Sequence, residues 1–174
     1  MEDPKYPIGK FAKPERIDAA MREQFIREIA AAPTALRAAV AGLDDRKLDT
    51  AYRDGGWTVR QVVHHLPDSH MNAYVRLKLA LTESEPVIKP YAEDRWAELP
   101  DAKHAPVDSS LALLESIHFR WIACMREMKA EDFEKKFRHP ERGLMSLNDM
   151  LALYAWHGKH HVAHIRSLRK KMGW

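Results

Sequence analysis

The chain has 174 residues, the size of one domain, and its hydrophobic fraction of 45% supports a buried core and excludes a disordered chain. No apolar run reaches the roughly 18 residues of a membrane span and no signal peptide is recognisable, so we expect a cytoplasmic protein without a membrane partner. The net charge is only +3, and the one basic cluster, residues 166–171, suits the end of a helix, so we expect no nucleic-acid partner.

Amphipathic periodicity predicts the first two long helices. The first covers residues 14–32, where large apolar residues recur every four positions, and a shorter helical piece follows over residues 33–43. The second covers residues 58–81 and begins with a capping box, in which the side chains of Thr58 and of the residue three positions later satisfy free backbone donors. Pro67 removes one backbone donor inside this helix, and we expect a kink there.

The rest of the chain is predicted to hold a long loop and two further helices. The proline-rich residues 83–106 indicate an irregular loop with one helical turn near residues 93–99. Apolar stripes predict helices over residues 109–128 and residues 146–172, and no segment shows the alternation of a strand. Residues 1–174 are therefore expected to form a single all-α domain, an up-down four-helix bundle with a long irregular loop.

Histidine is the residue type in excess, since four of the ten lie between His157 and His164. On a helical wheel of about 100° per residue, His161 falls near the centre of the apolar face of the last helix, and His157 lies about 40° to its side. Histidines four residues apart lie on one helix face, the spacing by which two imidazoles share one metal ion. From this spacing alone, a metal site and a pH-sensitive buried pair are equally supported.

A second histidine cluster lies at residues 64–70, within the second long helix. Periodicity places His70 nearest the centre of the apolar side of this helix and His65 on a polar flank beside Gln61 and Asp68. Such a flank is typical of the wall of a polar pocket and equally typical of a solvated surface. Periodicity alone therefore favours His70 over His65 as the core-facing residue.

Several motifs, taken in order, resemble the DinB superfamily of metal-dependent helical bundles. The similarity lies in residues 57–66 (WTVRQVVHHL) and residues 157–165 (HGKHHVAHI), and shorter stretches at residues 6–9, 52–61 and 70–72 resemble its YfiT branch. The family pattern places one metal histidine eight residues after the tryptophan of the first motif and two more, four residues apart, in the last helix. The resemblance therefore implies that His65, His157 and His161 hold one divalent ion, zinc or nickel, in a homodimeric up-down bundle.

The resemblance also implies a function. Proteins of the YfiT branch are described as metal-dependent hydrolases, and other relatives transfer low-molecular-weight thiols. Three neutral imidazoles leave the charge of the ion uncompensated, so a bound water loses its proton toward a pKa of about 7, and a bound thiol is held as thiolate. We expect a hydrolase that activates water against a small-molecule substrate. The alternatives are a thiol transferase and a non-catalytic, metal-stabilised stress protein.

Three further residues are candidates for catalysis. Asp68 lies one turn beyond His65 and could orient a ligand or act as a base. His164 lies on the flank of His161 and is expected to tune the ligands or to carry protons. Arg120, in the third long helix, could bind an anionic group of the substrate. For Asp68 and Arg120 an ordinary surface position is the alternative.

The irregular parts of the chain carry several large aromatic residues. Four of them, Tyr6, Phe11, Tyr91 and Trp96, lie in the N-terminal arm and in the long loop. This is more aromatic surface than a small monomer usually exposes, so it favours the homodimer that the resemblance implies.

Overall fold

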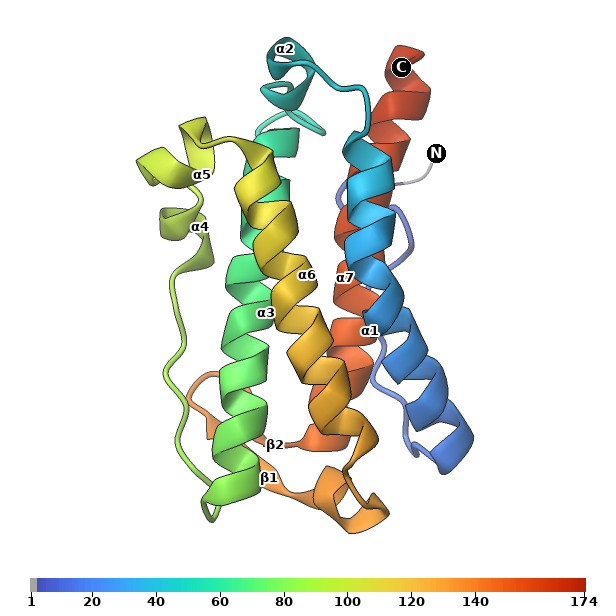
Figure 1. The fold of residues 1–174 in the computed structure, drawn as a ribbon, viewed down its shortest axis with the longest axis vertical. Helices are drawn as coiled ribbons and strands as arrows, with labels where there is room; N and C mark the ends of the chain where they lie inside the picture. Colours follow the sequence, from blue (N-terminus) through green and yellow to red (C-terminus); the bar gives the residue numbers. More distant parts are fainter. Residues whose placement is uncertain (1–2) are drawn as a thin grey trace.

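The computed structural model describes residues 3–174 and confirms an all-α four-helix bundle (Figure 1). The long helices are α1 (Ala19–Val40), α3 (Val59–Thr82), α6 (Val107–Arg126) and α7 (Leu147–Met172). The shorter elements are α2 (Asp45–Leu48), α4 (Glu93–Trp96), α5 (Pro100–His104), the 3-10 helix η1 (Ala130–Glu134) and the strands β1 (Lys136–His139) and β2 (Gly143–Ser146). The predicted second, third and last long helices are confirmed to within two residues at each end.

α3 and α6 run in the same direction, because residues 83–106 carry the chain back along the bundle between them (Figure 1). The N-terminal ends of these two helices meet where Arg60 donates to the carbonyl of Ala105 at 3.1 Å. α1 and α7 run the opposite way, and the C-terminal ends of this pair meet where Arg169 donates to the carbonyl of Ala39 at 2.9 Å. α1 and α3 each pack mainly against α6 and α7, so they occupy opposite corners of the bundle. The long helices therefore follow an up-down-down-up order.

The first helix differs from the prediction, which divided it at residue 33 and began it at residue 14. α1 begins after Asp18, whose side chain caps the helix by accepting from the Met21 amide at 2.8 Å, and it continues through Pro33. The proline removes one backbone hydrogen bond, but Ile29 and Leu36 on either side of it are fully buried at 0% exposure. Packing of the apolar stripe therefore outweighs the local effect of the proline.

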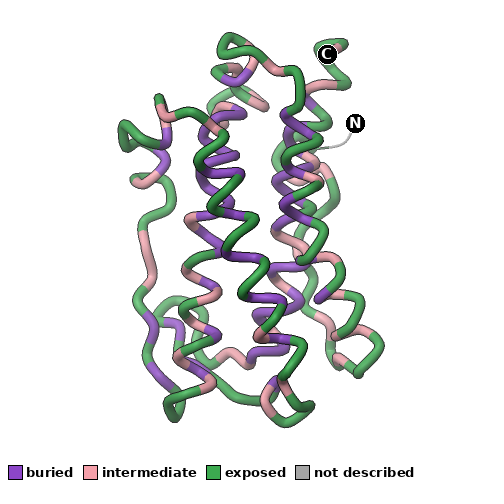
Figure 2. The backbone as a smooth tube through the Cα atoms, in the orientation of Figure 1, coloured by how far each residue is buried: buried purple, intermediate pink, exposed green. Residues whose placement is uncertain are grey.

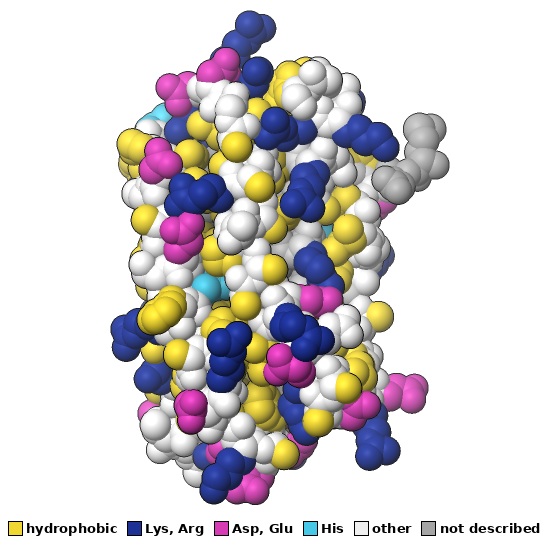
Figure 3. Space-filling model, turned by 45° about the vertical axis from the view of Figure 1, so that its right-hand side comes forward, with side chains coloured by type: hydrophobic (Ala, Val, Ile, Leu, Met, Phe, Trp, Pro, Cys, Tyr) yellow, Lys and Arg dark blue, Asp and Glu magenta, His cyan; other side chains and the backbone are white. Residues whose placement is uncertain are grey.

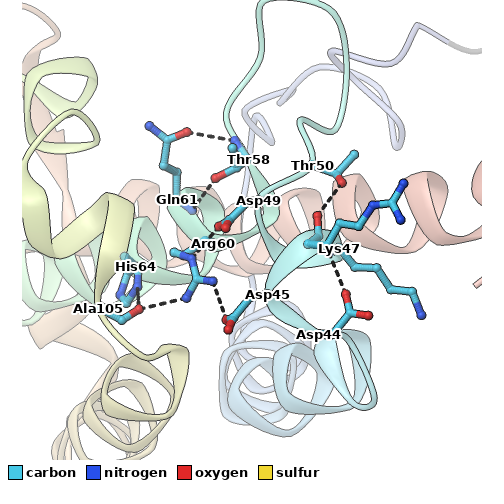
Figure 4. Close-up of polar contacts among 11 residues, drawn as sticks. Asp44, Asp45, Lys47, Asp49, Thr50, Thr58, Arg60, Gln61, His64 and Ala105 are labelled. Carbon is cyan, nitrogen blue, oxygen red and sulfur yellow. Dashed lines mark hydrogen bonds and ion pairs between the residues drawn. The ribbon is translucent and has the colours of Figure 1, made fainter.

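The start of α3 is fixed by the polar contacts shown in Figure 4. The predicted capping box is confirmed, because the Thr58 side chain accepts from the Gln61 amide and the Gln61 side chain accepts from the Thr58 amide. The buried side chain of Arg60 donates to Asp49 at 2.6 Å and to Asp45 at 2.7 Å. These contacts hold α3 against α2. They also fix the rotation of α3 about its axis, and with it the direction in which His65 points.

The segment between α6 and α7 corrects the expectation that the chain has no strand. β1 and β2 form an antiparallel hairpin in which Phe137 pairs with Met145 and His139 with Gly143. Each strand has only four residues, too few for alternation to stand out in the sequence, and Phe137 anchors the hairpin in the core at 1% exposure. The expected turn in the long loop is confirmed and is accompanied by a second short helix, since α4 and α5 both lie there.

Buried residues follow the inner faces of the long helices along the whole bundle (Figure 2). They form two apolar clusters, one around Ile29, Leu77, Trp121 and Leu151, the other around Leu36, Leu66, Leu114 and Ile165. Along each long helix, the residues of one cluster end only a few positions before the residues of the other begin. On three of the helices a buried histidine lies between the two clusters: His70 on α3, His118 on α6 and His161 on α7. A histidine layer therefore separates the two halves of the core.

Acidic and basic side chains are interspersed on the face shown in Figure 3, and they do not gather there into a basic stripe. Within residues 3–174, no helix combines the length and the apolar composition needed to cross a bilayer.

The aromatic residues that were expected to be exposed are half-buried, and their rings contact other rings of the same chain. Phe11 lies against Trp156 with ring centroids 5.9 Å apart, and Tyr91 lies against Trp96 at 4.6 Å. The aromatic argument for a homodimer is therefore not supported, because these rings already have partners in their own chain.

Candidate metal centre

α3 and α7 bring three histidines together in the middle of the bundle. One ring nitrogen from each of His65, His157 and His161 lies within 4.8 Å of the others, and Nε2 of His65 lies 3.3 Å from Nε2 of His157. His65 and His161 are buried, and His157 is half-buried. α3 is helical on both sides of Pro67, and the proline does not turn His65 away from α7. The same three residues are those that the family resemblance implied.

The donor set fits a divalent transition-metal ion. Nitrogens bound to zinc at about 2.0–2.1 Å in a tetrahedron lie about 3.3–3.4 Å apart, which matches the separation between His65 and His157. Nδ1 of His161 is buried and has no hydrogen-bond partner within residues 3–174. An unpartnered buried nitrogen is unfavourable unless something else binds to the ring or near it, so this residue also fits a site for an ion.

Burial keeps these imidazoles neutral. It lowers the pKa of His65 to about 4 and lowers the pKa of His157 and His161 well below the ordinary value of 6.5. The neighbouring histidines lower these pKa values further, because two adjacent imidazolium ions would repel each other. The lone pairs that a metal ion needs are therefore available at neutral pH.

His70 is fully buried, as periodicity indicated, but it lies behind the three-histidine cluster. Its Nε2 lies 3.1 Å from Nδ1 of His157, and its Nδ1 lies 2.7 Å from Nε2 of His118. Nδ1 of His118 in turn lies 2.8 Å from the carbonyl oxygen of Ile29. The sequence analysis did not single out His118, so this contact was missed.

The other neighbouring histidines have different surroundings. Nε2 of His64 donates to the carbonyl of Ala105 at 3.1 Å, and its Nδ1 accepts from Ser110 at 2.6 Å, so both ring nitrogens are used away from the cluster (Figure 4). His160 stacks on Trp156 with ring centroids 4.2 Å apart. Within the described residues, neither belongs to the group of ring nitrogens that lie within 4.8 Å of one another.

A pocket of about 880 Å³ opens beside the cluster and is lined by His65, His157 and His161. Its wall also carries five basic side chains and three acidic ones. The basic residues are Lys5, Arg53, Arg76, Arg95 and Arg142, and the acidic ones are Glu93, Asp94 and Glu141. Because the lining histidines are neutral, the wall carries an excess of positive charge before any metal ion is counted.

The three candidate catalytic residues have different positions in the structure. His164 lines the pocket, donates from Nε2 to the carbonyl of Lys5 at 3.1 Å and stacks on Tyr52. Asp68 is half-buried outside the lining of this pocket, and burial raises its pKa to about 6. Arg120 is exposed, with its guanidinium over the Tyr74 ring, which places it at the surface and corrects its expected place in the pocket.

Sequence reasoning missed the cationic residues of the pocket. Arg76 lies on α3, and Arg142 lies in the turn of the hairpin. Within the described residues, neither arginine has a carboxylate within 4.0 Å, although Glu93 also lines the pocket. The pattern around Arg76 resembles any polar helix flank, and Arg142 reaches the pocket only through a hairpin that the sequence did not reveal.

The buried histidines predict a steep loss of stability in acid. The pKa of His65, His118 and His160 falls from 6.5 in the unfolded chain to about 4 in the fold, so below pH 6.5 the unfolded chain binds more protons. The free energy of unfolding of the metal-free protein should fall by about 1.4 kcal/mol per pH unit for each such group until pH 4. Urea titrations between pH 7 and pH 4 measure this slope.

His118→Gln should reduce this slope by about one proton, because it removes one imidazole whose pKa burial lowers to about 4. Stability that stayed flat between pH 6.5 and pH 4.5 would contradict the burial of neutral imidazoles in this core.

Comparison with known proteins supports the fold and shows the family of this chain. The family model of the DinB superfamily matches residues 28–165. Proteins from Bacillus cereus and Bacillus anthracis, each named "Putative metal-dependent hydrolase", are 55% identical to this chain over 100% of both sequences. YfiT from Bacillus subtilis, described as a probable metal-dependent hydrolase with an unusual four-helix bundle topology, has a TM-score of 0.96 and 48% identity over 98% of each chain.

A more distant solved four-helix bundle protein has a TM-score of 0.55 and 19% identity, over 81% of this chain and 94% of its own, and it shares the fold alone. The match to the family model and the identity to the Bacillus proteins extend over most or all of the chain. This chain therefore belongs to the DinB superfamily.

Proposed function

We propose that this protein is a single-domain, metal-dependent hydrolase of a small-molecule substrate. It holds one divalent ion per chain, zinc or nickel, at His65, His157 and His161. The observation that carries the proposal is the convergence of three neutral imidazoles on one wall of a pocket of about 880 Å³. The names of the Bacillus relatives and the description of YfiT support the same reading.

The bound ion would supply Lewis-acid chemistry, which lowers the pKa of a coordinated water toward about 7. The protein adds no negative charge of its own to this site, because all three ligands are neutral. Trp57 lies against His65 with ring centroids 4.7 Å apart and against His161 at 6.4 Å. This indole holds the two rings in place and keeps bulk water off that side of the site.

A hydrolase also needs a group that accepts a proton, and two residues of the pocket wall suit this role. Nε2 of His164 donates to a backbone carbonyl, so Nδ1 of the neutral ring carries a lone pair, and this atom has no hydrogen-bond partner within residues 3–174. Burial raises the pKa of Glu93 above its ordinary value, which makes this carboxylate a better proton acceptor. Asp68 is less suitable, because it lies outside the pocket lining.

The pocket favours a substrate that carries a carboxylate or a phosphate. Arg76 and Arg142 both line it. The pKa of His139, which also lines the pocket, is lowered mainly by burial and then by the positive charges of these two arginines. Both guanidinium groups therefore act on the same part of the pocket wall. Without a carboxylate of their own, they can bind an anionic group by charge-assisted hydrogen bonds. They take the role that the sequence analysis gave to Arg120.

Metal content tests the choice of ligands. His65→Ala, His157→Ala and His161→Ala should each abolish tight binding of one ion per chain, because two imidazoles alone hold a divalent ion poorly. His64→Ala and His160→Ala are the matched controls on the same helices and should keep the ion. Elemental analysis measures the content, with circular dichroism to confirm folding. A His161 variant that kept its metal while a His160 variant lost it would contradict this assignment.

Activity tests the substrate class. The zinc- or nickel-loaded protein should hydrolyse esters or amides that carry a carboxylate or phosphate faster than their neutral isosteres. Arg76→Gln and Arg142→Gln should each raise KM by about 10-fold or more, as expected for a lost hydrogen bond between charged groups, with a smaller change in kcat. Arg120→Gln should leave both constants unchanged. Transfer of a thiol to the substrate without any hydrolysis would contradict the hydrolase.

We further propose that the chain forms a homodimer and works in the cytoplasm. Support for the dimer now comes from large apolar side chains exposed on two neighbouring helices, Val75 on α3 and Phe119 on α6, at 49% and 79% exposure. Their burial in a second copy would remove apolar surface from water. Sedimentation equilibrium at micromolar concentration should give twice the chain mass for the wild type and less for Phe119→Lys. A monomeric wild type would contradict the dimer.

A further inference from the structure

A line of four groups crosses the core and takes one member from each long helix. It begins at the carbonyl oxygen of Ile29 on α1 and continues through His118 on α6 and His70 on α3 to His157 on α7. The three contacts measure 2.8, 2.7 and 3.1 Å. The two middle residues are 2% and 0% exposed, so water does not offer them other partners.

The carbonyl at the start of this line decides where every proton lies. A carbonyl oxygen only accepts, so Nδ1 of His118 carries a hydrogen and donates it to Ile29. A neutral imidazole has one N–H, so Nε2 of His118 accepts, and Nδ1 of His70 must donate to it.

The same step repeats at the next contact. Nε2 of His70 accepts from Nδ1 of His157, which leaves the lone pair of His157 on Nε2. This is the atom that lies 3.3 Å from Nε2 of His65. The opposite arrangement would set the lone pair of His118 against the Ile29 oxygen at 2.8 Å, where two acceptors repel each other.

We propose that His118 and His70 are positioning residues that fix the tautomer and the ring orientation of His157, so that its Nε2 faces the metal site before the ion arrives. The inference rests on the proposed metal site and assigns a role to two residues outside it. A metal-binding histidine usually donates its second N–H directly to a carboxylate, a carbonyl or a water. Here two further imidazoles stand between the candidate ligand and the carbonyl that orients it.

The first test needs no metal and no variant. In the metal-free, 15N-labelled wild-type protein at pH 7.5, long-range 1H–15N spectra should show His157 protonated at Nδ1 and unprotonated at Nε2. Loss of the signal in His157→Gln assigns it. A wild-type His157 that carries its proton on Nε2 would overturn the proposal.

The second test compares His118→Leu with His118→Gln. Glutamine can donate to Ile29 and accept from His70, so it should keep the wild-type tautomer of His157. Leucine fills the space but leaves His70 free to turn its proton toward His157, so a large share of His157 should move to the Nε2–H form. Zinc affinity, measured by competition with a chromophoric chelator, should fall by about 10-fold to 100-fold in His118→Leu and by much less in His118→Gln.

The outcomes separate this inference from the proposed function. If the wild type shows the expected tautomer but binds no zinc, the metal site fails and the ordering of the imidazoles stands. If the wild type binds zinc tightly and His118→Leu keeps both the tautomer and the affinity, the positioning role fails and the metal site stands. If His118→Leu does not fold, two measurements still test the positioning role: the tautomer of His157 in the wild type and the zinc affinity of His118→Gln.

Discussion

A buried imidazole is stable only when it is neutral and its N–H donates to an acceptor. The arrangement of the helices around the histidines depends on this requirement. Between the two apolar halves of the core, His65, His70, His118, His157 and His161 lie close enough for neighbouring rings to touch. An isolated polar ring in an apolar core would be destabilising. Here one backbone carbonyl supplies the acceptor for a whole row of rings, and the remaining lone pairs point toward one place beside the pocket. An unmatched member of such a layer is costly, and Nδ1 of His161 is a ring nitrogen of this layer that has no hydrogen-bond partner within residues 3–174.

The connectivity of the bundle supports this layer. Because α3 and α6 run in parallel, His70 and His118 reach the same depth in the core, and α7 lies across from them with His157. Close packing also matters at Gly158, where a side chain would come within 3.1 Å of Cβ of Ala32 and 3.7 Å of Cε1 of His70. The residue beside a candidate ligand is therefore kept small so that α1 and α7 can approach each other next to the histidine row.

The long helices and two of the clustered histidines could be predicted from local patterns, because periodicity reports directly which residues of a helix face the core. His157 and His161 are examples, as is the capping box at Thr58. Periodicity failed where the decisive partner lies elsewhere in the chain. It favoured His70 over His65, although both are buried and only the position of α7 distinguishes a ring in the cluster from one behind it.

Other errors had the same physical origin. Pro33 suggested a break, but the packing of α1 on α6 and α7 keeps the helix continuous. Arg120 looked like a pocket residue because the rotation of α6 was unknown, whereas Arg142 reaches the pocket through a hairpin too short to show in the sequence. The family resemblance selected His65, which lies in the cluster, because motif spacing carries information about tertiary contacts that a single helix does not contain.

The order of the candidate ligands along the chain has a consequence for biosynthesis. His65 and His157 are 92 positions apart, and both clustered histidines of α7 are made after α1, α3 and α6. Domains of a nascent chain fold as units once their residues have emerged. An ion held by all three candidate ligands could therefore bind only after α7 is made, and the pocket beside the cluster would give it a route to the three imidazoles in the folded bundle.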